Sequence, residues 1–315
     1  MGTIQTVLGP VESGSLGFTL MHEHIMVRTP GVADNFPTIW DRAAEIDYAA
    51  TALSEARAVG VQTLVDATTF EMGRDVEFMA EVARRSDLRV IASTGVWLEP
   101  PPYFQSCDVD QIAELFVREI EAGIASTGIK AGIIKCATDV QGVTPIIEKA
   151  LRAAARAHRA TGVPITTHTD AAKEMGTLQQ DIFESEGVDL KRVIIGHSGD
   201  STDIAYLARL MGRGSYIGMD RFGLDNFLPT AQRVATIASL CGMGHSDRLV
   251  LSQDAICYVE WWNRTAMRQA LPNWHHSYLA GEVLAELIAA GVTDEQIDRM
   301  TIANPRSIFE RCDPY

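Results

Sequence analysis

The chain has 315 residues, of which 46% are hydrophobic and 22% charged, the balance of an ordinary globular protein, so intrinsic disorder is excluded as its general state. Its 27 basic and 41 acidic residues give a formal net charge of −14, which repels nucleic acids and anionic membranes. No Lys or Arg precedes Arg28, and no apolar run approaches the ~18 residues that span a bilayer, so we expect a cytoplasmic protein.

Cysteine usage narrows the class further. The five cysteines are an odd number, and no two of them are spaced as CxxC. This pattern argues against a disulfide framework and against a zinc site built from thiolates.

Short apolar runs rich in Val, Ile, Leu and Thr alternate along the chain with longer helix-like segments. The predicted strands end near His24, Asp66, Gly95, Lys135, His168, His197, Asp220 and Asp254. The predicted helices include 41–59, 74–86, 110–126, 144–161 and 229–242, where apolar residues recur every three and four positions. Gly60, Gly162 and Gly187 follow three helices, where a left-handed cap is expected.

Eight strands alternating with helices predict an α/β fold, a single (β/α)8 TIM barrel spanning residues 1–315 as one domain. A doubly wound sheet would call for a nucleotide-binding fingerprint. Gly212-x-Gly214 lacks the third glycine and precedes a strand, and Gly123-x4-Gly128 is not followed directly by lysine. We therefore favour the barrel.

Titratable side chains close several of the predicted strands, and strand ends form the active site of a barrel. In His22-Glu23-His24, residues two apart share a face, so both histidines are expected to point into the barrel mouth and Glu23 away from it. The fourth, fifth, sixth and eighth strands end in Lys135, His168, His197 and Asp254. Singly, these could be hydrogen-bonded core histidines, a rim lysine and a helix cap; jointly they predict a catalytic metal centre. Imidazole and carboxylate suit zinc, iron, cobalt or manganese.

The remaining four histidines occupy no strand end. His158 lies in the middle of a predicted helix and is expected at the surface, and His245 lies in a loop. His275 and His276 follow the last predicted strand. We place all four outside the metal shell.

The order of these residues resembles the amidohydrolase superfamily, and several strings resemble its phosphotriesterase-like lactonases over essentially the whole chain. The strings include TLMHEH (19–24), GIKAGIIKCATD (128–139), VIIGHSGDSTD (193–203), GMDRFGLD (218–225) and LVLSQD (249–254). The resemblance implies a binuclear centre of two divalent transition-metal ions, zinc or iron, cobalt or manganese. It also implies a homodimer.

By the same resemblance, His22, His24 and Asp254 would hold the more buried metal, and His168 and His197 the more exposed one. Lys135 would carry a carbamate derived from carbon dioxide, whose oxygens bridge both ions. A metal-bridging hydroxide would open a lactone, and Asp254 would take its proton.

Residues after the third, seventh and eighth strands are candidate substrate contacts. The resemblance implies that Arg221 organises the loop over the eighth strand; the alternative is an ion pair with an acid such as Asp220. The segment 255–275 contains Ile256, Tyr258 and three tryptophans, and we predict that it forms an apolar channel for an acyl chain. Trp261 is the best candidate, because it is similar in position to a tryptophan of the lactonase loop.

Two positions depart from the lactonases that the chain resembles. Trp97 stands where many of them have a tyrosine, and a tryptophan there is closer to the true phosphotriesterases. Ala255-Ile256 stands where relatives often carry a cysteine, which makes this subsite wall bulkier and purely apolar.

These observations favour a metal-dependent lactonase that acts on N-acyl-homoserine lactones (quorum quenching), with weak promiscuous phosphotriesterase activity. A dedicated organophosphate triesterase or aryl esterase is the alternative, and Trp97 supports it. A mononuclear deaminase would leave Lys135 without a purpose. A non-catalytic lactone-binding protein should have lost ligands, yet all six candidates are present.

Overall fold

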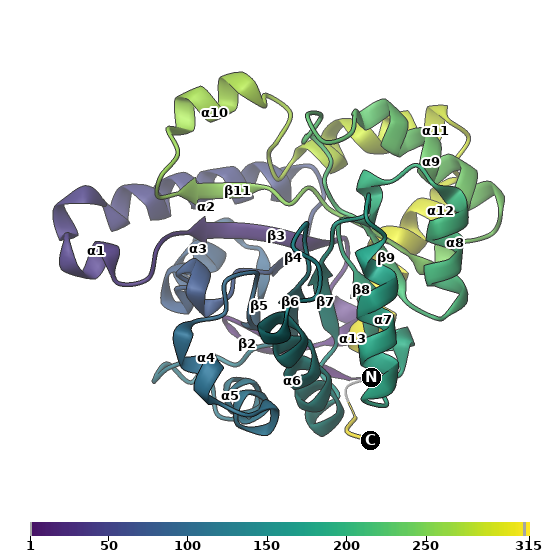
Figure 1. The fold of residues 1–315 in the computed structure, drawn as a ribbon. Coiled ribbons are helices and arrows are strands. Elements are labelled where there is room, and N and C mark those ends of the chain that lie inside the picture. The colour runs from purple at the N-terminus through teal and green to yellow at the C-terminus, as the bar shows by residue number, and fades with distance from the viewer. Residues whose placement is uncertain (1, 311–312) are drawn as a thin grey trace.

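The computed structural model describes residues 2–310 and 313–315, and it has a curled parallel sheet at its centre with helices packed around it (Figure 1). Nine strands pair in the order β10-β9-β8-β7-β6-β5-β4-β3-β11. Their bounds are β3 Thr19–Val27, β4 Thr63–Asp66, β5 Arg89–Gly95, β6 Ile133–Ala137, β7 Ile165–His168, β8 Val193–Ile195, β9 Tyr216–Met219, β10 Leu249–Leu251 and β11 Ile256–Val259. A separate antiparallel hairpin consists of β1 (Thr3–Thr6) and β2 (Gly9–Glu12).

The predicted barrel class is confirmed, and each of the eight predicted strands is present in the parallel sheet. The prediction missed the ninth strand, because β11 follows β10 after only a short loop and reads in the sequence as the start of a long loop. It pairs in parallel with β3 on the side opposite β4. The backbone N–H of Asp254 also donates to the carbonyl of His22 at 3.1 Å, which joins the end of β10 to β3.

Helices connect successive strands and cover the outside of the sheet (Figure 1). They are α1 Val32–Asn35, α2 Arg42–Ala58, α3 Val76–Ser86, α4 Pro102–Ser106, α5 Val109–Glu121, α6 Pro145–Thr161, α7 Met175–Ser185, α8 Ile204–Gly212, α9 Thr230–Gly242, α10 Arg264–Ala270, α11 Leu284–Ala289, α12 Asp294–Asp298 and α13 Asn304–Phe309. None of the helices in residues 2–310 is long and apolar enough to cross a membrane.

Polar caps explain where the predicted helices begin. Asp41 accepts hydrogen bonds from two backbone N–H groups of α2, and Asp75 and Thr144 do the same for one N–H each of α3 and α6. The predicted helix 110–126 ends early, at Glu121, because the chain turns at Gly123, whose φ is 112°.

Apolar side chains pack inside the barrel, among them Met21, Val65, Ile91, Ile133 and Val250, all buried. The register of β3 against β4 shifts between Leu20 and Glu23, with one extra residue in β3. This bulge, which includes His22, changes the alternation of side chains within the part of β3 that carries the two histidines.

One expectation for the fold was wrong. His158, expected at the surface of α6, is fully buried. Its Nδ1 lies 2.7 Å from the carbonyl of Val163 and its Nε2 2.7 Å from the hydroxyl of Tyr315. Burial lowers the pKa of His158 to about 4, so the imidazole is a neutral structural group.

Gly95 and Gly60 offer a matched test of close packing at a strand end. Both have positive φ, 104° and 106°. A Cβ on Gly95 would lie 1.9 Å from the carbonyl oxygen of Lys135, whereas a Cβ on Gly60 would meet nothing within 4 Å. We expect Gly95→Ala to cost at least about 3 kcal/mol of unfolding free energy and Gly60→Ala only about 1–2 kcal/mol, measured by urea denaturation. Equal costs would contradict the packing described here.

Candidate metal centre

The structure brings the six predicted metal-binding side chains together at the carboxyl ends of the strands. His22 and His24 lie on β3, Lys135 on β6 and His168 at the end of β7. His197 follows β8, and Asp254 lies three residues after β10. Lys135 and the four histidines are each less than 10% exposed, so the cluster is almost fully withdrawn from solvent.

The side chains of the cluster lie close to one another, and most of the short distances involve Asp254. Lys135 Nζ lies 2.7 Å from His22 Nε2. One oxygen of Asp254 is 3.3 Å from His24 Nε2 and 3.8 Å from His22 Nε2, and the other is 3.7 Å from His197 Nε2. The ring of His168 stands edge-on to that of His197, with centroids 4.6 Å apart. The Asp254 carboxylate is therefore the common neighbour of three imidazoles.

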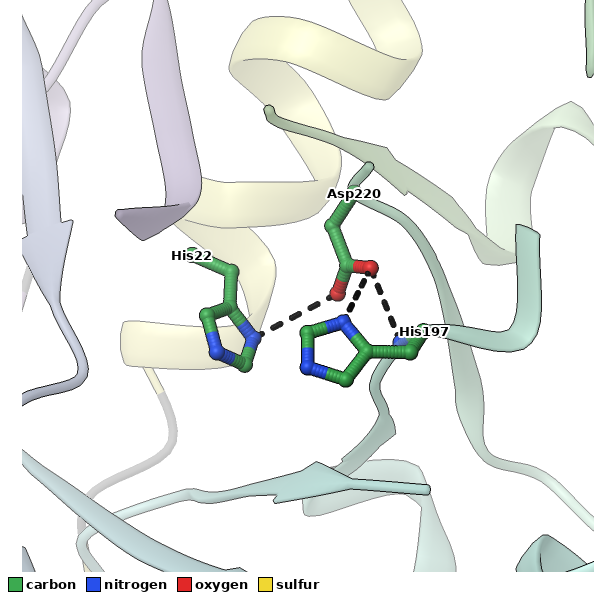
Figure 2. A group of neighbouring side chains, drawn as sticks. All are labelled: His22, His197 and Asp220. Atoms are coloured by element: carbon green, nitrogen blue, oxygen red, sulfur yellow. Dashed lines mark hydrogen bonds and ion pairs between the residues drawn. The ribbon is translucent and has the colours of Figure 1, made fainter. Parts of the chain in front are cut away.

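A polar partner faces the other nitrogen of each ring. Asp220, which follows β9, lies 2.9 Å from His197 Nδ1 and 3.4 Å from His22 Nδ1 (Figure 2). Thr68 Oγ1 lies 2.7 Å from His24 Nδ1, and Asp139 lies 2.9 Å from His168 Nε2. Such partners fix the tautomer and orientation of metal-binding histidines. Here they leave Nε2 of His22, His24 and His197 and Nδ1 of His168 available as ligands.

Two groups of side chains have ligand atoms within 4.8 Å of one another: His22, His24 and Asp254, and His22, His197 and Asp220. Asp220 faces Nδ1 of both its histidines, on the side away from Asp254. It also accepts the backbone N–H of His197 at 2.8 Å. We therefore interpret Asp220 as an orienting partner and the Asp254 side of the rings as the metal-binding side.

Protonation states also fit divalent cations, which need neutral imidazole and ionised carboxylate. Burial lowers the pKa of His22 to about 4 and that of His197 well below its usual value. Burial acts to raise the pKa of Asp254, but His197, His24 and Arg221 outweigh it and hold that pKa well below its usual value. The donor set is thus ready to bind metal near neutral pH.

A cavity of about 450 Å³ opens above the cluster. Its floor consists of the six candidate ligands, and the rest of its wall is formed by Val27, Arg28, Thr29, Glu71, Met72, Trp97, Glu99, Arg221, Ile256, Val259, Trp261 and Trp262. The volume suits a small organic ligand, and most of the upper wall is apolar.

Four of the five predicted substrate contacts line this cavity: Trp97, Arg221, Ile256 and Trp261. The ring of Trp97 stands edge-on to His168 with centroids 5.8 Å apart, and Trp261 is 59% exposed at the mouth. Tyr258 is not part of the described cavity wall; its ring packs against Trp40 instead, with centroids 6.4 Å apart.

Arg221 joins the candidate ligands to a second carboxylate. Its Nε donates to Asp254 at 3.1 Å and its Nη1 to Asp200 at 2.8 Å. Asp220, which the sequence suggested as its ion-pair partner, is instead engaged by His197 and His22. Arg221 therefore acts directly on the position and charge of Asp254.

Sequence reasoning missed Glu71, which lies in a short turn after β4 and on the cavity wall. Its Oε1 accepts hydrogen bonds from the hydroxyl of Thr69 at 2.8 Å and from the backbone N–H of Trp97. Burial raises the pKa of Glu71 to about 7. Glu71 thus anchors the segment that carries Trp97. No motif marks it, because it follows the strand by five residues.

The fold and the site together define the class: an α/β barrel protein whose strand ends carry a candidate metal centre of four histidines, a lysine and an aspartate. The model of the phosphotriesterase family matches residues 2–309. The chain therefore belongs to the phosphotriesterase family.

Individual relatives agree with this assignment. The chain is 46% identical to a phosphotriesterase homology protein of Mycobacterium tuberculosis (strain ATCC 25618 / H37Rv), over 100% of both chains. It is 37% identical to an aryldialkylphosphatase of Saccharolobus solfataricus, over 95% of this chain and 96% of that protein. The solved structure of the phosphotriesterase from Mycobacterium tuberculosis superposes with a TM-score of 0.96 at 45% identity, covering 100% of both chains.

Glu71 predicts a pH-dependent difference in stability. Its folded pKa of about 7 lies above the ordinary 4.5, so the folded state holds a proton that the unfolded chain releases, and stability falls as pH rises from about 4.5 to 7. Glu71→Gln stays neutral throughout. From pH 5 to pH 8 we expect the wild type to lose about 2 kcal/mol relative to this variant, or about 4–8 °C in Tm. Parallel melting curves across this range would show that Glu71 is not held protonated.

Proposed function

We propose that the protein is a binuclear metal-dependent hydrolase that opens lactones, with N-acyl-homoserine lactones as its preferred class. The observation that carries this proposal is a cluster of six candidate ligands, five of them buried, below a wall that is mostly apolar but also contains Arg28, Glu71, Glu99 and Arg221. The cluster offers ligands for two divalent ions, and the apolar part of the wall offers contacts to an acyl chain. Zinc, iron, cobalt and manganese all suit these ligands.

In this proposal His22, His24 and Asp254 would hold one ion, His168 and His197 would hold the other, and Lys135 would serve as a further ligand. When bound, the ions supply a water nucleophile near neutral pH and polarise the scissile carbonyl. Asp254 is held ionised and accepts the proton of the attacking water. Asp254 then delivers the proton to the alkoxide that leaves as the ring opens, which yields a hydroxy acid.

Lys135 fits the role of a carbamate. Burial lowers the pKa of its amine to about 8, so about a tenth is neutral at pH 7, far more than for an exposed lysine. A neutral amine adds to the carbon of carbon dioxide and loses a proton, giving an anionic oxygen donor where an ammonium could not coordinate. The proposal is supported by the distance of 2.7 Å between Lys135 Nζ and His22 Nε2.

A dedicated organophosphate triesterase or aryl esterase is the second candidate. Trp97 supports it, because its indole lines the cavity beside His168 and offers no hydroxyl to a lactone ring. The names of the two relatives also point to phosphoric esters. The ratio of turnover on a lactone to turnover on an aryl dialkyl phosphate separates the two candidates.

The decisive experiment is proton release by the purified protein, loaded with divalent metal, on acyl-homoserine lactones of increasing chain length. We expect rapid ring opening that Lys135→Ala lowers by at least about 1000-fold, because a bridging ligand is lost. Lys173→Ala is the matched control, since Nζ of Lys173 donates to the carbonyl of Val140 at the surface and is not part of the described cavity wall. No lactone turnover by protein that holds about two metals would refute the lactonase proposal, and the phosphotriester would be measured next.

Trp261 provides a test of the acyl channel. Because its indole lines the cavity at the mouth, Trp261→Ala should remove apolar contact with long chains and spare short ones. We expect kcat/KM to fall roughly 10-fold for a long-chain lactone and little for a short-chain one. Phe36→Ala, which removes a 61%-exposed aromatic ring outside the described cavity wall, is the control. A uniform loss at all chain lengths would place the acyl group elsewhere.

We further propose a homodimer located in the cytoplasm, which size measurements and fractionation would test. Both follow from the sequence and its resemblance to lactonases.

A further inference from the structure

Asp254 has a left-handed backbone, with a φ of +55°. Aspartate enters this region more often than most residues other than glycine, but the conformation still costs free energy that the surrounding contacts must offset. The question is therefore which contacts impose this conformation on the residue that three imidazoles share.

Glu23 makes these contacts. Its Oε1 accepts the backbone N–H of Gln253 and the hydroxyl of Ser252, each at 2.7 Å. Its Oε2 accepts the backbone N–H of Ala255, also at 2.7 Å. One carboxyl group thus binds the residues immediately before and immediately after Asp254. Because Glu23 is 0% exposed, water does not compete for these bonds.

We propose that Glu23 is a positioning residue that holds residue 254 in the left-handed conformation and thereby directs the Asp254 carboxylate at the histidine rings. The first part of this inference, the backbone conformation of residue 254, is independent of the proposed metal centre. Only the second part, the direction of the Asp254 carboxylate, rests on it. Glu23 is not part of the described cavity wall, and its hydrogen bonds go to the residues on either side of Asp254. The HxH sequence thus contributes three functional side chains, two facing the barrel mouth and one facing the segment between β10 and β11.

His197 also has a left-handed backbone, but here a carboxylate binds the residue itself and not its neighbours. Its φ is also +55°, and Asp220 accepts both its backbone N–H and its ring Nδ1. Two left-handed residues are therefore held by two separate buried acids. This gives the experiment an internal control, because loosening one acid should release only its own partner.

The test compares glycine with alanine at position 254. Both Asp254→Gly and Asp254→Ala lack the carboxylate, so they differ only in their tolerance of a left-handed backbone. With Glu23 present, the Asp254→Gly variant should melt about 2–5 °C above the Asp254→Ala variant. In the Glu23→Gln background an amide N–H₂ faces the N–H of Ala255, so the hydrogen bond from Ala255 to residue 23 is lost. The difference in melting temperature between Asp254→Gly and Asp254→Ala should then disappear. All melts are run with a chelator, so that metal loading does not contribute.

The same comparison at position 197 is the matched control. The difference between His197→Gly and His197→Ala should persist with Glu23→Gln and disappear with Asp220→Ala, because asparagine would still offer an oxygen to the N–H of residue 197. If Glu23→Gln does not fold, Glu23→Asp takes its place, because the shorter acid cannot reach both neighbours of Asp254.

A glycine advantage at 254 that survives the loss of Glu23 would overturn the proposal. The second half has its own readout, the zinc affinity of Glu23→Gln with Asp254 intact, which should weaken about 10- to 100-fold. If the glycine advantage is lost but the zinc affinity is unchanged, Glu23 holds the backbone of residue 254 but does not direct the Asp254 carboxylate, and the second part of the proposal is refuted. Failure of the lactonase proposal would change neither measurement.

Discussion

Buried carboxylates that bridge neighbouring strand ends hold the candidate metal centre together. Glu23, Asp66 and Asp220 are each 0–1% exposed, and each accepts at least one backbone N–H near a candidate ligand. Burying a charged or acidic group is costly unless its hydrogen bonds are satisfied, so these acids fix the surrounding backbone firmly. The imidazoles and Asp254 take their directions from this frame, and the cavity lies above them.

The sequence predicted the barrel and the cluster well, because both follow from local patterns. Alternating apolar runs and helices define the barrel, and a titratable residue at the end of a parallel strand must face its open end. It failed where long-range contacts decide. His158 reads as a surface residue of α6 and is buried. Glu23 points away from the barrel mouth as predicted, but its hydrogen bonds to both neighbours of Asp254 have no local signal in the sequence. Glu71 carries no signal, since only folding brings it under Trp97.

The cavity divides into a polar floor and an apolar upper wall, and Trp97 lies at the junction. The backbone N–H of Trp97 donates to Glu71, and its ring contacts His168. A change of substrate from lactone to phosphotriester at this position would therefore involve both the Trp97 ring and Glu71. Trp97 in the sequence therefore left both lactones and phosphotriesters open as substrates. The shape of this subsite depends on the Trp97 ring and also on Glu71, which holds the segment that carries it.

The ninth strand, β11, has a consequence for how this protein can diversify in evolution. Ile256 and Val259 line the cavity from within the sheet, so substitutions there disturb strand pairing with β3 as well as the ligand. Trp261 and Trp262 lie just beyond the strand and are 59% and 48% exposed. Descendants of this sequence can therefore exchange the outer lip of the cavity freely, while its inner wall is inherited together with the fold.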